Sequence, residues 1–166
     1  MRRAFTLVEL LVVIAIMAIA SVLMIGSLGS DDDIEVAAAA RTLAARLDYA
    51  RARAASTGQP HYVVVGDDDQ TLGFHTHDGT AWQDVIDPVD GTAVVIDYAG
   101  AVGLAGRDFD GHDLFGFDAT GEPFGCSVAR ADAEPLLVEA SFTLAVGGLS
   151  RTVRVAPVTG RVAVDE

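Results

Sequence analysis

Hydrophobic residues fill the N-terminal part of the chain in one long run, from Phe5 to Ile25, with only three polar interruptions. A helix over this run is about 31 Å long, close to the roughly 30 Å hydrocarbon core of a bilayer. Two arginines precede the run, and an aspartate triplet at 31–33 follows it. Because basic residues favour the cytoplasmic side, the pattern predicts a transmembrane helix over residues 5–29 whose N-terminus is cytoplasmic.

A second, amphipathic helix is predicted over residues 30–58. The segment at 26–30, Gly-Ser-Leu-Gly-Ser, contains weak helix formers and predicts a bend before this helix. Beyond it, apolar residues recur at spacings of three and four, as one face of a helix requires. This stripe consists of Val36, Ala40, Leu43, Leu47, Ala50 and Ala54. Gly58 and Pro60 supply a stop signal, and we expect the stripe to cover a sheet.

From residue 59 to the end, residues 59–166, the pattern changes to short β-like runs separated by Gly, Asp and Pro. The predicted strands are His61–Val65, Thr71–His75, Thr92–Asp97, Leu114–Phe117, Leu136–Val146, Arg151–Ala156 and Arg161–Val164. Gly147-Gly148 and Thr159-Gly160 predict tight turns between strands. The fold class is therefore α+β: a long N-terminal helix packed on an antiparallel β-sheet or small β-sandwich.

A secretory signal peptide is the competing interpretation of the N-terminus. Ala18-Ile19-Ala20 resembles a small-residue cleavage site after an apolar stretch. The apolar run continues beyond this site to Ile25, and Glu9 places a carboxylate where signal peptides are purely apolar. Both features favour a retained helix.

Charge and cysteine content narrow the class of function. The net charge is -13, from 24 acidic and 11 basic residues, and every basic residue is Arg. Nucleic acid and anionic lipid surfaces attract cationic faces, so this balance disfavours a nucleic-acid partner. Cys126 is the only cysteine, which excludes an intrachain disulfide and a thiolate metal cluster.

Glu9 is the most informative polar residue of the apolar run. A carboxylate inside hydrocarbon costs several kcal/mol, so it should be neutral or paired with a cation. One interpretation is a side chain that reaches the membrane interface, since Glu9 lies barely one turn into the run. The sharper interpretation is a pairing with a cationic group of another subunit.

The segment 4–11, Ala-Phe-Thr-Leu-Val-Glu-Leu-Leu, resembles the processing motif of type IV pilins and type II secretion pseudopilins. The resemblance implies a leader peptide over residues 1–4, cleavage by a prepilin peptidase between Ala4 and Phe5, and N-methylation of Phe5. It also implies that Glu9 meets the Phe5 amine of the neighbouring subunit during assembly. The chain has Ala4 where the family usually has Gly, a change to another small residue.

Segments of the outer helix and the C-terminal half resemble the H-type minor pseudopilins of type II secretion (GspH) and their FimT-like relatives. They are Ala45–Arg51, Phe117–Pro123, Gly148–Val155 and Thr159–Val162. The resemblance implies a minor pseudopilin, without a cofactor, that helps to build the short periplasmic filament. Its implied partners are other pseudopilins or pilins, the prepilin peptidase and the inner-membrane assembly platform.

Two alternatives stay open at this point. The same fold could serve as a minor type IV pilin at a pilus tip, in adhesion, motility or DNA uptake. A membrane-tethered enzyme or binding domain that never polymerises is the third hypothesis. In each case we expect a single-pass protein of the bacterial inner membrane with its C-terminal domain in the periplasm.

Few residues suggest a catalytic or metal-binding site. His61, His75, His77 and His112 could supply nitrogen ligands to a metal, but exposed loop histidines are the expected interpretation. The segment 108–113, Asp-Phe-Asp-Gly-His-Asp, has alternating oxygen ligands like a calcium loop but lacks the closing Glu. No motif for an activated nucleophile or a phosphate loop appears, so we expect neither a metal site nor catalysis.

Overall fold

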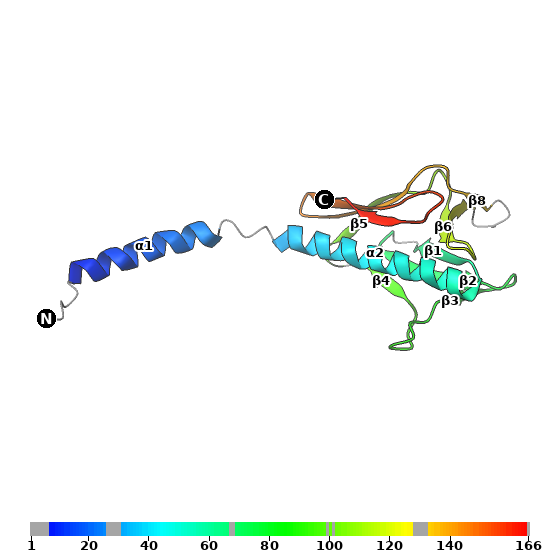
Figure 1. The fold of residues 1–166 in the computed structure, drawn as a ribbon, viewed down its shortest axis with the longest axis horizontal. Helices are drawn as coiled ribbons and strands as arrows, with labels where there is room; N and C mark the ends of the chain where they lie inside the picture. Colours follow the sequence, from blue (N-terminus) through cyan, green and yellow to red (C-terminus); the bar gives the residue numbers. More distant parts are fainter. Residues whose placement is uncertain are drawn as a thin grey trace.

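The structure is a computed structural model that describes residues 7–25, 31–66, 69–98, 100, 102–127 and 133–165. Helix α1 (Leu7–Ile25) extends away from the β-strands, and helix α2 (Asp31–Thr57) lies along them (Figure 1). Within these described residues, the structure contains no helix that is both long and apolar enough to cross a membrane. The bend predicted at 26–30 lies outside the described residues.

The amphipathic helix is confirmed. The buried residues of α2 are the six of the predicted stripe: Val36, Ala40, Leu43, Leu47, Ala50 and Ala54. The helix ends at the predicted stop, where Gly58 has φ 67° and its amide donates to the carbonyl of Ala54 at 2.9 Å. At the other end, the Arg151 guanidinium donates to Asp33 at 2.8 Å and ties the first turn of α2 to a strand.

The larger sheet is antiparallel, with strand order β3-β2-β1-β6-β7-β8, and β4 also pairs with β2. Its strands are β1 (His61–Val65), β2 (Thr71–His77), β3 (Trp82–Asp84), β4 (Val95–Asp97), β6 (Leu114–Phe117), β7 (Pro123–Cys126) and β8 (Glu134–Pro135). One face carries Val63, Phe115 and Phe117, which are fully buried. This face joins the core beneath α2.

The smaller sheet has strand order β11-β10-β9-β5 and is also antiparallel. Its strands are β5 (Gly103–Asp108), β9 (Ala140–Val146), β10 (Leu149–Val155) and β11 (Val162–Val164). Both predicted turns are confirmed: Gly147 and Gly148 join β9 to β10 with φ of 56° and 87°. The second turn joins β10 to β11, where the amide of Gly160 donates to the carbonyl of Ala156 at 3.0 Å.

The core lies where α2 covers the two sheets (Figure 1). Phe109, Phe115, Phe117 and Phe142 form its aromatic centre, with ring centroids 5.1 to 5.9 Å apart. The rings of Phe115 and Phe142 belong to different sheets, so their contact joins the sheets directly. The α+β fold expected from the sequence, a helix packed on antiparallel strands, is therefore confirmed, with α2 in contact with strands of both sheets.

Several predicted strand boundaries were wrong. The run 136–146 is one strand only from Ala140 onward, because Leu137 and Val138 are exposed residues of a bend that precedes it. The run 92–97 is a strand only over Val95–Asp97. The strands β3, β5, β7 and β8 were not predicted at all.

Candidate assembly site and surface groove

The predicted processing and assembly residues lie at the N-terminus. Ala4 and Phe5 are outside the described residues. Glu9 lies in the first turn of α1 and is exposed. A carboxylate in the first turn interacts favourably with the positive end of the helix dipole. The structure thus places the acid of the motif at the helix end nearest the predicted cleavage site.

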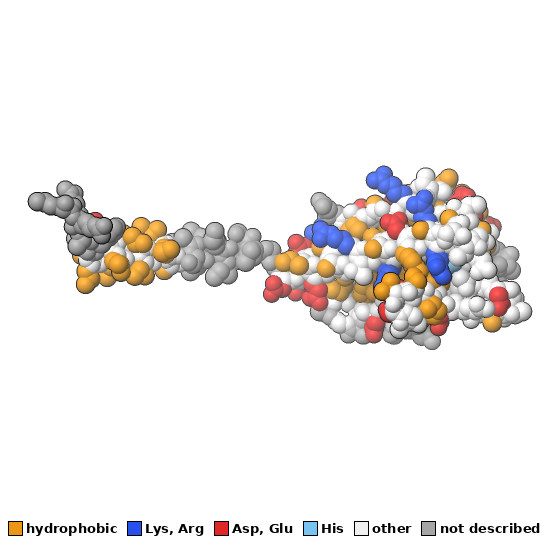
Figure 2. All heavy atoms as spheres, turned by 60° about the horizontal axis from the view of Figure 1, so that its bottom comes forward, with side chains coloured by type: hydrophobic (Ala, Val, Ile, Leu, Met, Phe, Trp, Pro, Cys, Tyr) orange, Lys and Arg blue, Asp and Glu red, His pale blue; other side chains and the backbone are white. Residues whose placement is uncertain are grey.

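The described side chains of α1 present an apolar surface. Leu7 is 81% exposed and Met17 65% exposed, and hydrophobic side chains cover this part of the helix (Figure 2). Acidic side chains gather where α2 begins, at Asp31–Asp33 (Figure 2). A contiguous exposed apolar surface of this kind marks a membrane or protein interface. The first helix therefore has the surface of an anchor or assembly element.

The expectation of exposed loop histidines was wrong for three of the four: His61 lies in β1, and His75 and His77 lie in β2. His61 is buried, and its Nδ1 lies 3.0 Å from the carbonyl of Gln59. His75 Nδ1 lies 3.0 Å from Asp84, and the ring of His77 packs against Trp82 with centroids 5.1 Å apart. Over the described part of the chain, no three His, Cys, Asp or Glu side chains are grouped so that they could hold a metal ion.

The calcium-like segment 108–113 uses its carboxylates to hold the protein backbone. Asp108 accepts a hydrogen bond from the amide of Asp110 at 3.1 Å. Asp110 in turn accepts one from the amide of Leu137 at 3.1 Å, although the two residues are far apart in sequence. The segment therefore connects the end of β5 to the chain that precedes β9.

The turn at 118–121 belongs to one of the segments that carries the pseudopilin resemblance. The Asp118 carboxylate accepts hydrogen bonds from the Thr120 hydroxyl at 2.7 Å and from the amides of Thr120 and Glu122 at 2.8 Å. Partial burial opposes ionisation of Asp118, but these hydrogen bonds outweigh it and hold its pKa below the usual range. An ionised Asp118 therefore fixes the turn.

A close approach joins this turn to the turn between β10 and β11. A Cβ on Gly160 would lie 2.8 Å from the carbonyl oxygen of Gly121 and 3.1 Å from the Arg51 side chain. Both glycines have positive φ, 83° for Gly121 and 61° for Gly160. Three segments noted separately in the sequence thus meet at the C-terminal end of α2.

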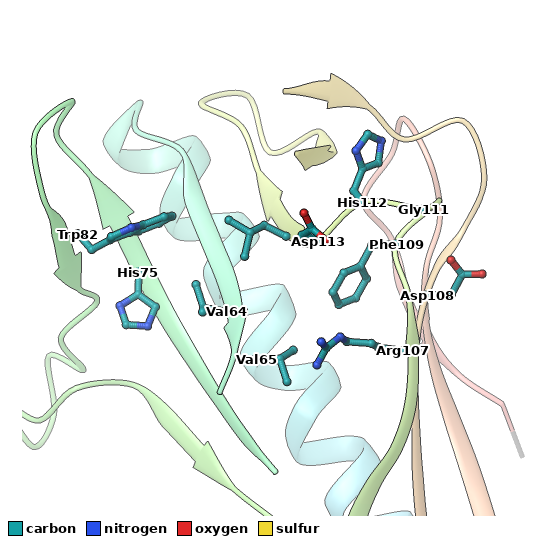
Figure 3. A pocket seen from close by; sticks show the side chains of 11 residues that line it. Val64, Val65, His75, Trp82, Arg107, Asp108, Phe109, Gly111, His112 and Asp113 are labelled. Atoms are coloured by element: carbon teal, nitrogen blue, oxygen red, sulfur yellow. The ribbon is translucent and has the colours of Figure 1, made fainter. Parts of the chain in front are cut away.

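A groove of about 900 Å³ lies between the two sheets, lined by residues of β1, β2 and β3 in the larger sheet and by β5 and the segment that follows it. Figure 3 shows Trp82 and His75 on one side, Arg107 and Phe109 on the other, and Val64 between them. Its volume falls within the range of ligand-binding pockets.

Aromatic packing supports the Trp82 side of the groove. Tyr62 is edge-on to Trp82 at 5.0 Å and to Phe124 at 5.4 Å. Tyr62 and Phe124 are each 7% exposed, whereas Trp82 is 41% exposed. Trp82 therefore packs against the buried ring of Tyr62, and part of its own ring stays exposed to solvent.

Sequence reasoning did not identify this groove. Trp82, Arg107 and Phe109 lie between residues 66 and 113, where we found no family resemblance. One signal was available: Trp82 is the single tryptophan of the chain and follows a polar, glycine-containing turn. A lone tryptophan beside such a turn is unlike a core residue.

Known proteins resemble the chain in its N-terminal segment and in its fold. Residues 1–26 match the family model described as the prokaryotic N-terminal methylation motif. No curated protein sequence matches the chain.

Solved structures match the fold. The minor pseudopilin EpsH from the type 2 secretion system of Vibrio cholerae has a TM-score of 0.58 at 14% identity, covering 79% of this chain and 96% of EpsH. A second EpsH structure has a TM-score of 0.54 at 16% identity, covering 78% and 92%. The type IV minor pilin FimU of Pseudomonas aeruginosa has a TM-score of 0.54 at 18% identity, covering 81% and 90%. The chain thus carries the prokaryotic N-terminal methylation motif, and its fold is similar to that of these minor pseudopilin and minor pilin structures.

Proposed function

We propose that the chain is a minor pseudopilin, a structural subunit of the periplasmic filament of a type II secretion system. The observation that carries the proposal is the combination of a methylation motif at residues 1–26 with a pilin-like fold on the same chain. The exposed apolar surface of α1 supports it, because a subunit helix needs lipid before assembly and neighbouring helices afterwards. The role is structural rather than enzymatic.

In this proposal residues 5–29 anchor the chain in the inner membrane, with the N-terminus in the cytoplasm and residues 59–166 in the periplasm. The long apolar sequence run and the two arginines before it support this orientation. Carbonate extraction of membranes and protease digestion from the periplasmic side test it. A chain released by carbonate, or protected from the protease, contradicts the assignment.

Processing follows from the motif. A prepilin peptidase removes residues 1–4 after Ala4 and methylates the new amine of Phe5. Mass spectrometry of the mature protein should show N-methylated Phe5 as its first residue. A mature chain that starts at Ser21 instead contradicts the filament role, because the helix would have been discarded as a signal peptide.

Assembly then depends on Glu9. Its carboxylate pairs with the Phe5 amine of a neighbouring subunit, and an ion pair in a dry helical bundle favours one stagger of the helices over others. Glu9→Gln keeps the size and polarity of the side chain and removes its charge. We expect Glu9→Gln and Glu9→Ala to be cleaved normally and yet to be absent from sheared filaments. Normal incorporation of Glu9→Gln contradicts the charge pairing.

A minor type IV pilin is the second candidate, favoured by the match to FimU. The two candidates share processing, membrane anchor and fold. The neighbouring genes separate them: a secretin with other pseudopilins supports secretion, and a retraction motor supports a pilus. In either case the partners are other pseudopilins or pilins, the prepilin peptidase and the inner-membrane assembly platform.

A further inference from the structure

A second hollow, separate from the groove, lies near the C-terminal end of α2. It is formed where the turn between β6 and β7 meets the start of β1 and the short strand β8, and its volume is about 330 Å³. Figure 1 shows β8 at the end of the molecule away from α1. We call this hollow the proline pocket, because Pro60, Pro123 and Pro135 line it.

The floor of the proline pocket is apolar and tightly packed. Tyr62 and Phe124 lie on either side of Gly116 in neighbouring strands. A Cβ on Gly116 would lie 2.9 Å from the ring of Phe124, so only glycine lets this ring reach Tyr62, to which it is edge-on at 5.4 Å. The three proline rings are rigid as well. A ligand group therefore meets a preformed apolar surface.

The charged residues that line this pocket, within the described part of the chain, are all acidic: Asp118, Glu122 and Glu134. Asp118 already accepts the hydrogen bonds that fix its own turn. The carboxylates of Glu122 and Glu134 form no hydrogen bond or ion pair with the described residues. Arg51 packs against the same turn at Gly121, but it does not line the pocket. A cationic group is therefore favoured there and an anionic one is disfavoured.

The shape of the pocket selects among cations. A guanidinium is planar and weakly hydrated, so it stacks on flat apolar surfaces and donates hydrogen bonds to carboxylates at the same time. The ammonium of lysine is a compact and strongly hydrated charge that gains less from such a surface. The volume of the pocket lies near the lower limit for ligand sites, roughly 300 Å³, and suits a single side chain. Arginine side chains in pockets of this kind are common at the centres of protein interfaces.

We propose that the proline pocket binds the side chain of an arginine that belongs to a partner protein. The guanidinium lies on the proline rings and the aromatic floor, and it donates hydrogen bonds to Glu122 and Glu134. This site is separate from the groove and from the N-terminal assembly residues. The inference goes beyond the proposed function, and its test needs no filament, because it uses the purified full chain.

The experiment is an NMR titration of the ¹⁵N-labelled full chain in neutral detergent. The probe is a blocked peptide, Gly-Arg-Gly, and its counterparts carry citrulline, which has the shape of arginine without the charge, or lysine. We expect saturable shifts at the amides of Glu122 and Phe124, with binding about tenfold weaker for citrulline and about threefold weaker for lysine. Equal binding of the arginine and citrulline peptides, or no saturable shift at these amides, overturns the proposal. Equal binding of the arginine and lysine peptides overturns the assignment to arginine.

Two further results test the location of the site. Saturable shifts at Val64 and Trp82, in place of those at Glu122, would put the arginine in the groove and overturn the proline pocket. Glu122→Gln should weaken binding of the arginine peptide about fivefold, and the added change Glu134→Gln should weaken it further. The matched control is Glu35→Gln, the same loss of charge at an exposed position of α2, which should alter binding less than about twofold. Equal effects of Glu122→Gln and Glu35→Gln overturn the proposal. The peptide comparison on the unaltered chain stands even where a variant does not fold.

Discussion

The α2 stripe predicts a large and local loss of stability when one of its leucines is shortened. Leu47 is fully buried in the core that joins α2 to the two sheets. Leu47→Ala removes the apolar side chain and leaves a cavity that the surrounding residues fill only in part. Changes of this type cost about 2 to 5 kcal/mol, and we expect about 3 kcal/mol because neighbouring strands and the helix limit collapse of the site. In a chain of this size that corresponds to a decrease in Tm of roughly 10 °C.

Urea denaturation of the full chain in neutral detergent measures this cost. Trp82 reports unfolding, because its ring packs against Tyr62 in the folded state. The expected change is a lower midpoint with an unchanged slope, which indicates lost stability rather than a change in the surface exposed on unfolding. The matched control is Leu137→Ala, since Leu137 is 85% exposed. We expect the control to change the unfolding free energy by less than about 0.5 kcal/mol.

Equal destabilisation of the chain by Leu47→Ala and Leu137→Ala would contradict the burial of Leu47 in the core. That result would mean that α2 does not contribute its apolar stripe to the core in solution. A loss below about 1 kcal/mol at Leu47 would point the same way, because it falls outside the range for a buried leucine.

Two other predictions concern stability. Val158 has φ 64°, a left-handed conformation that disfavours β-branched residues, and it is 67% exposed. Val158→Gly should therefore stabilise the fold by about 0.5 to 1 kcal/mol. The control is Val89→Gly, because Val89 is exposed and does not have a positive φ, and it should not stabilise the fold. Equal effects of the two variants on the unfolding free energy in urea would contradict strain at Val158. Burial lowers the pKa of His61, with Arg53 acting in the same direction and a backbone hydrogen bond opposing them. The unfolded chain therefore takes up a proton near pH 6.5 that the folded chain resists, so the unfolding free energy should be level above about pH 7 and fall below it. His61→Gln should flatten this decrease between pH 7.5 and 5.5, and an unchanged slope would contradict the assignment to His61.

The helices and several strands could be predicted because their signals are local. The α2 stripe repeats with the helical period, and all six of its residues are buried. β1 and β6 were predicted with their observed bounds, since each is a short apolar run between turn residues. Glycine and proline also marked the correct ends of α2 and of the last two hairpins.

The missed strands lack such signals. β5, Gly103–Asp108, contains two glycines and a shift of register between Leu104 and Gly106, which removes the alternation of apolar and polar residues. β3 is exposed along its length, so no hydrophobic pattern marks it. β7, Pro123–Cys126, is buried throughout and begins with Pro, a residue that argues against a strand. Each depends on its neighbours in the sheet rather than on its own sequence.

The two candidate sites differ in the same way. The N-terminal motif is contiguous in sequence, so Ala4, Phe5 and Glu9 could be proposed from it directly. The groove combines Val64, Trp82 and Arg107, and the sheet order alone brings them together. No local pattern of residues predicts that arrangement.

The segments that resemble pilins and the middle segment therefore form different parts of the structure. The segments with a pilin-like resemblance form α1, α2 and the turns around the C-terminal end of α2. The middle segment supplies β2 to β5, residues on both sides of the groove, and an excursion whose residue Val89 is 92% exposed. That excursion is tied to α2 by the ion pair between Arg46 and Asp87, at 2.8 Å. In the proposed role as one subunit among several, the chain needs a surface that distinguishes it from the others. The middle segment provides one, because it is held against α2 and exposes Val89 and the groove.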